Sequence, residues 1–136
     1  MFQKTISLKA RPRGFHLITE EVVSQLHELQ DVEQGVLHLF IQHTSASLTL
    51  NENADPDVRA DMERYFLAAV ADDTPYFAHT LEGGDDMPAH IKSALLPTHL
   101  SIPVLGGRMA LGTWQGIYLF EHRDRPHTRC VVAHLQ

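Results

Sequence analysis

Residues 36–51 read Val36-Leu37-His38-Leu39-Phe40-Ile41-Gln42-His43-Thr44-Ser45-Ala46-Ser47-Leu48-Thr49-Leu50-Asn51, and this stretch decides the fold. Its first six residues are nearly all apolar and too few for a typical helix, so they predict a strand buried on both faces, with His38 inside it. Leu48 and Leu50 alternate with polar residues and predict a second strand. The polar segment 43–46 therefore lies between two strands.

The segments before this stretch predict one more strand and one helix. Residues 2–8 alternate between the two sides of a strand that ends before Arg11-Pro12. From Thr19 to Leu29 the apolar residues recur with a period of 3.6, and two glutamates occupy the first turn, where the helix dipole favours anions. This pattern is typical of an amphipathic helix.

The segments after it predict two helices and four strands. Asp55-Pro56 marks a helix start, because Asp caps free N–H groups and Pro tolerates the first helical position, and the apolar stripe runs to about Val70. A shorter helix is expected over 89–96, and strands over 102–105, 108–111, 116–121 and 128–135. The order β-α-β-β-α-α-β-β-β-β predicts one α+β domain, residues 1–136: a mainly antiparallel β-sheet or sandwich packed with two long helices and one short helix.

Composition excludes several function classes. The 136 residues are 43% hydrophobic and 21% charged, typical of a folded globular chain. Seventeen acidic against eleven basic residues give a net charge of −6, so we expect no nucleic-acid partner. The longest strictly apolar run, residues 65–71, is far below the ~20 residues of a membrane helix, and residues 1–10 lack a secretory apolar core. We therefore expect no membrane partner and a cytoplasmic location.

Cysteine and histidine counts limit the metal chemistry. Cys130 is the only cysteine, which excludes a thiolate-rich zinc cluster, whereas ten histidines are many for this length. His43, at the end of a strand, is one candidate ligand, and the plain alternative is a histidine hydrogen-bonded at the edge of the core. Thr44, Ser45 and Ser47 surround it with hydroxyls that suit a phosphate, although an ordinary Ser/Thr turn has the same composition.

Carboxylates and amides next to predicted helix starts are further candidates. His90 lies four residues after Asp86, so the two side chains share a helix face if the helix extends that far back. Such a pair fixes the tautomer of a metal ligand or a base, but it is also a routine surface contact. Asn51 and Glu52 begin a segment that suits Mg²⁺ or a polar substrate, and ordinary turn chemistry explains it equally well.

Three more residues are singled out by their positions. His79 lies in a loop, and no HExxH spacing exists, so a site of His43, His79 and His90 would have to be assembled by the fold. Trp114, between two glycines, could stack on a heteroaromatic ligand or close the core. Glu121 follows apolar residues on one strand face, where a carboxylate needs either a partner or an edge strand.

Three long motifs resemble a known family. They are His43-Thr44-Ser45-Ala46-Ser47-Leu48-Thr49-Leu50-Asn51-Glu52-Asn53, Asp85-Asp86-Met87-Pro88-Ala89-His90-Ile91-Lys92-Ser93 and Gly112-Thr113-Trp114-Gln115-Gly116-Ile117. Together they are similar to the YjbQ family, named for a secondary thiamine-phosphate synthase activity, and the likeness runs nearly end to end. The resemblance implies a compact α+β homotrimer with histidines clustered between subunits. It implies a metal site at His43, His79 and His90, with Zn²⁺ the expected ion; the alternative is a metal-free polar pocket in which protonated imidazoles bind an anion.

The implied reaction joins hydroxymethylpyrimidine diphosphate to a thiazole phosphate and releases pyrophosphate, with Mg²⁺ accompanying the diphosphate. The expected catalytic residues are His43, His90, Asp86 and Glu121. The expected residues for binding a small phosphorylated metabolite are Thr44, Ser45, Ser47, Asn51, Lys92, Trp114 and Gln115, with Arg108 as a second cation. Because the family name calls the activity secondary, a non-catalytic metal- or metabolite-binding protein and a metal-dependent hydrolase with three histidines remain alternatives.

Overall fold

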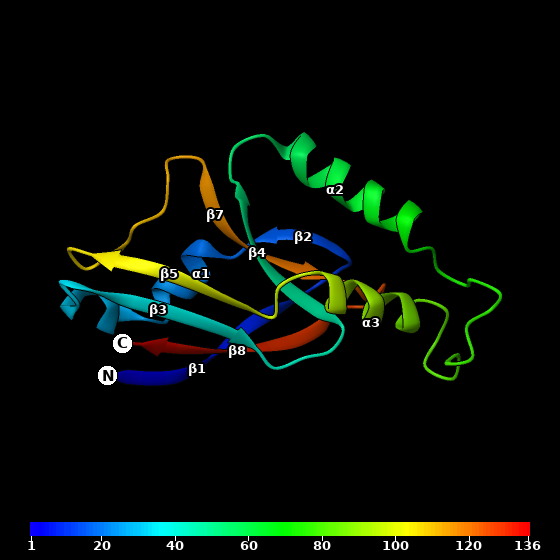
Figure 1. The fold of residues 1–136 in the computed structure, drawn as a ribbon, viewed down its shortest axis with the longest axis horizontal. Coiled ribbons are helices and arrows are strands. Elements are labelled where there is room, and N and C mark those ends of the chain that lie inside the picture. Colours follow the sequence, from blue (N-terminus) through cyan, green and yellow to red (C-terminus); the bar gives the residue numbers. More distant parts are fainter.

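The computed structural model describes residues 1–136 and contains two antiparallel sheets (Figure 1). Its strands are β1 (Phe2–Arg11), β2 (Gly14–Leu17), β3 (Gln34–Ile41), β4 (Ala46–Glu52), β5 (His99–Leu105), β6 (Arg108–Met109), β7 (Gln115–Glu121) and β8 (His127–Leu135). The larger sheet has the order β1-β8-β3-β5-β6 and the smaller one the order β2-β7-β4. Every pairing is antiparallel, which confirms the expected α+β class.

The main core lies between the two sheets. Nineteen buried apolar residues form one cluster, to which both sheets contribute, as in a β-sandwich. On β3 the inward side chains are Leu37, Leu39 and Ile41, each at most 1% exposed. A smaller aromatic cluster on the far side of the three-stranded sheet packs Phe15 and Phe120 against helix α2 (Pro56–Ala69).

The prediction that β3 is buried on both faces is wrong. Its alternate residues, His38 and Phe40 among them, point away from the core, and Phe40 is 52% exposed. The helices pack on strands of the three-stranded sheet, so the outer face of the five-stranded sheet stays open in one chain. The outward residues of β3 include Val36 and Phe40, so its sequence is nearly all apolar although only one face is covered.

The first predicted helix is broken into two short elements. Helix α1 (Thr19–Ser24) ends at Gln25, and a 3₁₀ helix, η1 (His27–Asp31), follows. Leu26 and Leu29 are 1% and 4% exposed, and the three-residue turn of a 3₁₀ helix places residues three apart on one side. Both leucines thus stay in the core although the helix is interrupted between them and α1.

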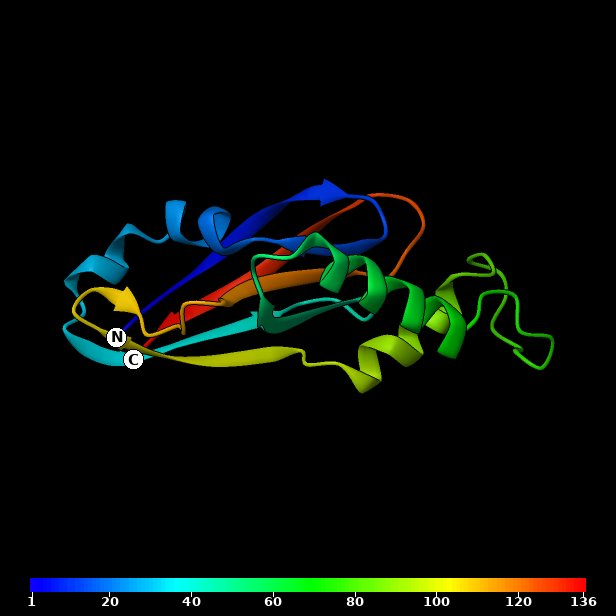
Figure 2. The ribbon, with the colours of Figure 1, turned by 90° about the horizontal axis from the view of Figure 1, so that it is seen from above.

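The remaining boundaries follow the sequence pattern closely. Strand β2 was not expected, because four residues are too few to show a period, and the strand expected over 108–111 is only β6. Helix α3 (Asp86–Leu95) begins three residues earlier than expected. No helix of the chain is long and apolar enough to cross a membrane. Figure 2 shows α1 and the β5–β6 turn at one end of the molecule, and the 70–85 loop at the other.

Candidate metal centre

Three potential metal ligands meet at the start of α3. Asp86 is the first residue of this helix, and His90 follows four residues later on the same face. His79 comes from the 70–85 loop between α2 and α3. The loop is closed by a hydrogen bond from the Asp73 N–H to the Gly84 carbonyl (3.1 Å), which brings its two ends together.

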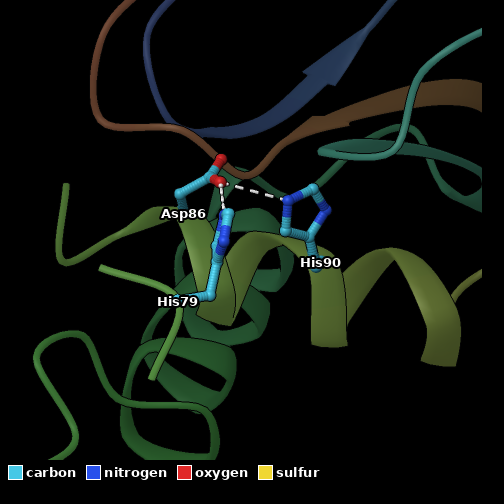
Figure 3. Close-up of side chains that lie close together, drawn as sticks. All are labelled: His79, Asp86 and His90. Atoms are coloured by element: carbon cyan, nitrogen blue, oxygen red, sulfur yellow. Dashed lines mark hydrogen bonds and ion pairs between the residues drawn. The ribbon is translucent and has the colours of Figure 1, made fainter. Parts of the chain in front are cut away.

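The contacts converge on one oxygen, Oδ2 of Asp86 (Figure 3). It lies 2.7 Å from Nε2 of His79 and 3.1 Å from Nε2 of His90. One ligand atom from each residue lies within 4.8 Å of the others, so the group could hold a metal ion. The Asp86 side chain is 6% exposed, whereas His79 and His90 are 47% and 35% exposed, which leaves the histidine side open.

The tautomer of His90 is set by the backbone. Nδ1 of His90 lies 2.9 Å from the carbonyl oxygen of Thr44, which can only accept a hydrogen bond, so Nδ1 carries a proton. In the neutral ring, Nε2 then presents a lone pair to the Asp86 carboxylate. Two lone pairs 3.1 Å apart repel unless a proton or a metal ion lies between them. Nε2 of His90 is therefore placed either to donate a proton to Asp86 or to bind a metal ion.

Arg123 holds the other side of Asp86. Its Nη1 lies 2.8 Å from Asp86 Oδ1, and its Nε donates to Asp85 Oδ2 at 2.8 Å. Burial alone would raise the pKa of Asp86, but the hydrogen bond from His79 and the charge of Arg123 outweigh it, and the pKa is lowered. For Asp85, the bonds from Arg123 and from the Asp124 N–H likewise overcome burial and lower the pKa to about 2. Both carboxylates are thus anionic at neutral pH.

His43 does not belong to this group in the chain. Its Nε2 accepts a hydrogen bond from the Cys130 N–H at 2.8 Å, so this nitrogen is occupied by backbone. Burial and the charge of Arg129 lower the pKa of His43, which keeps the ring neutral. The structure thus groups His79 and His90 with Asp86, and His43 lies outside this group of potential ligands.

The hydroxyls beside His43 have separate partners. Ser45 Oγ accepts from Arg129 Nη2 at 3.0 Å, and Ser47 Oγ is buried 2.8 Å from Nε2 of His122. Thr44 is exposed and contributes its carbonyl to His90. Three hydroxyls were predicted to bind phosphate. Thr44 lies next to the site and is open to solvent, the hydroxyl of Ser45 is paired with Arg129, and that of Ser47 is enclosed.

Lys92 and Glu121 are buried. The side chain of Lys92 lies inside the molecule with 1% exposure, and burial together with the charge of Arg13 lowers its pKa. Glu121 is 0% exposed, and its oxygens accept from Arg129 Nε at 2.8 Å and Arg129 Nη2 at 2.6 Å. The expected catalytic carboxylate is therefore one half of an enclosed ion pair, with no face left for a substrate.

The remaining predicted substrate residues lie elsewhere. Asn51, Trp114 and Gln115 line a separate hollow of about 440 Å³ with Leu50 and Glu52. It lies at the C-terminal end of β4, whereas Thr44 precedes the N-terminal end. Seven residues of extended chain span about 23 Å, so one subunit does not bring these residues to His90. Trp114 is 64% exposed, so it does not close the core.

Arg123 and the Thr44 carbonyl are the functional groups that the sequence patterns did not reveal. Arg123 follows β7 and lies 37 residues after Asp86 in the sequence, and no spacing rule links the two. Every residue has a backbone carbonyl, so no residue pattern marks the one of Thr44 as part of a site. The family likeness, which runs nearly end to end, covers this segment but gives Arg123 no role.

The fold and the site define a class: a small antiparallel α+β subunit with an open two-histidine, one-carboxylate group at a helix start. The family model described as "UPF0047 protein YjbQ-like" matches residues 4–136, and the chain belongs to this family. A UPF0047 protein YjbQ of Salmonella typhimurium is 58% identical over 135 residues, covering 99% of this chain and 97% of that protein.

Solved structures show the same fold. The conserved hypothetical protein TT1486 from Thermus thermophilus has a TM-score of 0.85 at 33% identity and covers 98% of this chain and 99% of its own. The hypothetical protein APE1520 from Aeropyrum pernix has a TM-score of 0.87 at 28% identity, with 100% and 98% covered. The resemblance drawn from the motifs is thus confirmed at the level of family and fold.

Proposed function

We propose that the chain binds a divalent metal ion, with Zn²⁺ preferred, through His79, Asp86 and His90, and uses it to act on a small phosphorylated metabolite. The observation that carries this proposal is the His90 tautomer: Nδ1 is committed to the Thr44 carbonyl while Nε2 faces the Asp86 carboxylate at 3.1 Å. A cation between them turns that repulsion into attraction.

The donor set suits a catalytic rather than a structural ion. Two imidazoles and one carboxylate are a common catalytic zinc set, in which further coordination positions stay open to water or substrate. The partly exposed histidines agree with such an open side. Arg123 would act as the outer support of the Asp86 ligand, as carboxylate ligands usually require.

Thiamine-phosphate synthesis is the activity that the family resemblance favours. The thiazole nitrogen would form a bond to the methylene of hydroxymethylpyrimidine diphosphate as the bond to pyrophosphate breaks. A bound divalent ion would supply charge stabilisation for the departing pyrophosphate. The roles of this chain are to hold that ion and to receive the phosphorylated substrate beside Thr44.

A homotrimer would connect the two separated groups of predicted substrate residues. The hollow formed with Asn51, Trp114 and Gln115 lies at the opposite end of β4 from His90 in one subunit. A neighbouring subunit can bring its copy of this hollow to the histidines. We therefore include self-association in the proposed function, with substrate bound between subunits.

A metal-dependent hydrolase is the second candidate. The open two-histidine, one-carboxylate group favours it, because the same donors activate a bound water for attack on a phosphate ester or a carbonyl. Both candidates share the metal and differ in whether water or the thiazole nitrogen is the nucleophile.

Elemental analysis tests the metal site. Protein made without a histidine tag should retain about one ion per chain at pH 7.5 and release it at pH 5.5, because protons compete for the ligand nitrogens. His90→Gln and Asp86→Asn should each lower metal content at least tenfold. His27→Gln is the matched control, because the His27 side chain is 80% exposed and lies outside the site.

Activity assays separate the two candidates. Metal-loaded protein should form thiamine phosphate from the two phosphorylated precursors, and the site variants should not. Release of phosphate from simple esters without thiamine phosphate would select the hydrolase instead. Metal content that is absent in the wild type, or unchanged by both site variants, would refute the site.

A further inference from the structure

A second cavity lies away from the candidate metal centre. It has a volume of about 580 Å³ and is formed between the α1–η1 segment and the residues around the β5–β6 turn. Figures 1 and 2 show both segments at the end of the molecule remote from the 70–85 loop that carries His79. Its size falls within the range of about 300–1,000 Å³ that is usual for small-molecule sites.

Five of the ten residues that line this cavity are hydrophobic. Leu26 and Leu29 are buried core residues that form its floor, and Met109 and Leu111 are partly buried against the same core. Val23, 42% exposed, lies at its open side. A ligand with an apolar body would therefore remove both its own surface and these side chains from water.

The only charge in the lining of the cavity is positive. None of its ten lining residues is acidic, although the whole chain has a net charge of −6. Arg108 is the one charged residue, and its guanidinium takes part in no ion pair within the chain. Thr19 Oγ1 already accepts from the Ile117 N–H at 2.9 Å, so its own proton is free to be donated.

We propose that this cavity binds a small amphiphilic anion, with its apolar body on the leucine floor and its carboxylate or similar head on Arg108. The proposal rests on charge complementarity. The Arg108 guanidinium has no carboxylate partner within the chain and lies at the edge of an apolar hollow, so the anionic head of a bound ligand would pair with it. It assigns a second ligand site to the chain, independent of the proposed metal chemistry.

Titration calorimetry with straight-chain carboxylates tests the site. Octanoate should bind with a dissociation constant below about 1 mM, and affinity should rise about fourfold per added methylene from hexanoate upward. Octanol, of equal length but without charge, should bind about tenfold more weakly. Treatment with a chelator should leave octanoate binding unchanged, so failure here and failure of the metal site are separate results.

Two variants locate the binding. Arg108→Gln should weaken octanoate about tenfold by removing the charge-assisted contact, and Val23→Trp should weaken it at least as much by filling the hollow. Both alter exposed side chains, so thermal melting should show folded protein. Arg125→Gln, at another exposed arginine, should change nothing.

Three outcomes would overturn the proposal. The first is no octanoate binding up to about 10 mM. The second is binding that is equal in the wild type and in both variants. The third is a change in molecular mass with Val23→Trp without any carboxylate binding, which would assign the hollow to a contact between copies of the chain.

Discussion

His122 is a residue whose charge is decided by its surroundings. It is 0% exposed, its Nε2 lies 2.8 Å from Ser47 Oγ, and its Nδ1 has no partner. Burial, followed by the charges of Lys92 and Arg129, lowers the pKa of His122 to about 3 from an ordinary value of 6.5. The ring is thus neutral when folded and takes up a proton readily only when the chain unfolds.

This difference predicts a loss of stability in acid. Between pH 6.5 and pH 3 the unfolded chain binds the proton and the folded chain does not, so the free energy of unfolding falls as pH falls. The contribution of His122 at pH 5 is a loss of about 2 kcal/mol relative to pH 8. Urea unfolding at pH 5 and at pH 8 measures this loss of stability. In His122→Gln the loss should be smaller than in the wild type by about 2 kcal/mol. An unchanged pH dependence in this variant would contradict the prediction, and His27→Gln serves as the neutral comparison.

At the scale of elements, the Glu121–Arg129 pair joins the two sheets. Glu121 ends β7 of the three-stranded sheet, and Arg129 lies in β8 of the five-stranded sheet. Arg129 also donates to the carbonyl and the hydroxyl of Ser45, just before β4. The Arg129 guanidinium therefore connects β8 with β7 and with the segment before β4. Without it, the buried Glu121 carboxylate would have no ion-pair partner.

Removing one partner of this pair should be costly. We expect Glu121→Ala to lower the free energy of unfolding by about 3–5 kcal/mol, since it leaves a buried guanidinium without its carboxylate. Replacing both residues, as Glu121→Leu with Arg129→Met, should cost less than the sum of the single changes, because no buried charge remains. Urea denaturation of Glu121→Leu, of Arg129→Met and of the double variant measures this coupling, and Glu121→Ala is measured beside them. A loss below about 1 kcal/mol in Glu121→Ala would show that the pair is not structural.

Local patterns predicted the parts of the site that lie on one element. The common face of Asp86 and His90 follows from helix geometry alone, so the i,i+4 spacing was sufficient. His79 lies in the connection between α2 and α3, seven residues before Asp86, where no periodic pattern places its side chain, and the Thr44 carbonyl lies 46 residues before His90. Such contacts depend on how the sheets and α3 pack together, and a short window of sequence does not contain that information. The same limit explains Glu121: its face was predicted as buried, but its partner on β8 was not predicted.

At the scale of the whole molecule, the outer face of the five-stranded sheet is the surface without a covering layer. Phe40 is 52% exposed there, beside the half-buried Val132 of β8, with which it pairs in register. His38 and His134 lie on the same face with ring centroids 5.9 Å apart. An exposed phenylalanine beside Val132 on an uncovered sheet face is typical of a contact surface, because aromatic residues are enriched at protein interfaces.

We expect this face to form one of the contacts between subunits of the proposed homotrimer. Light scattering of the wild type should give three times the chain mass of 15.3 kDa. Phe40→Lys should shift the mass toward that of one chain, because a lysine in the middle of an apolar contact is buried without a partner. Tyr65→Lys is the matched control, since Tyr65 is 67% exposed on α2 and lies on the far side of the three-stranded sheet. A wild-type mass of about 15 kDa would refute self-association. A trimer that persists in Phe40→Lys would instead place the contact on another surface, leaving the open sheet face without a role in assembly.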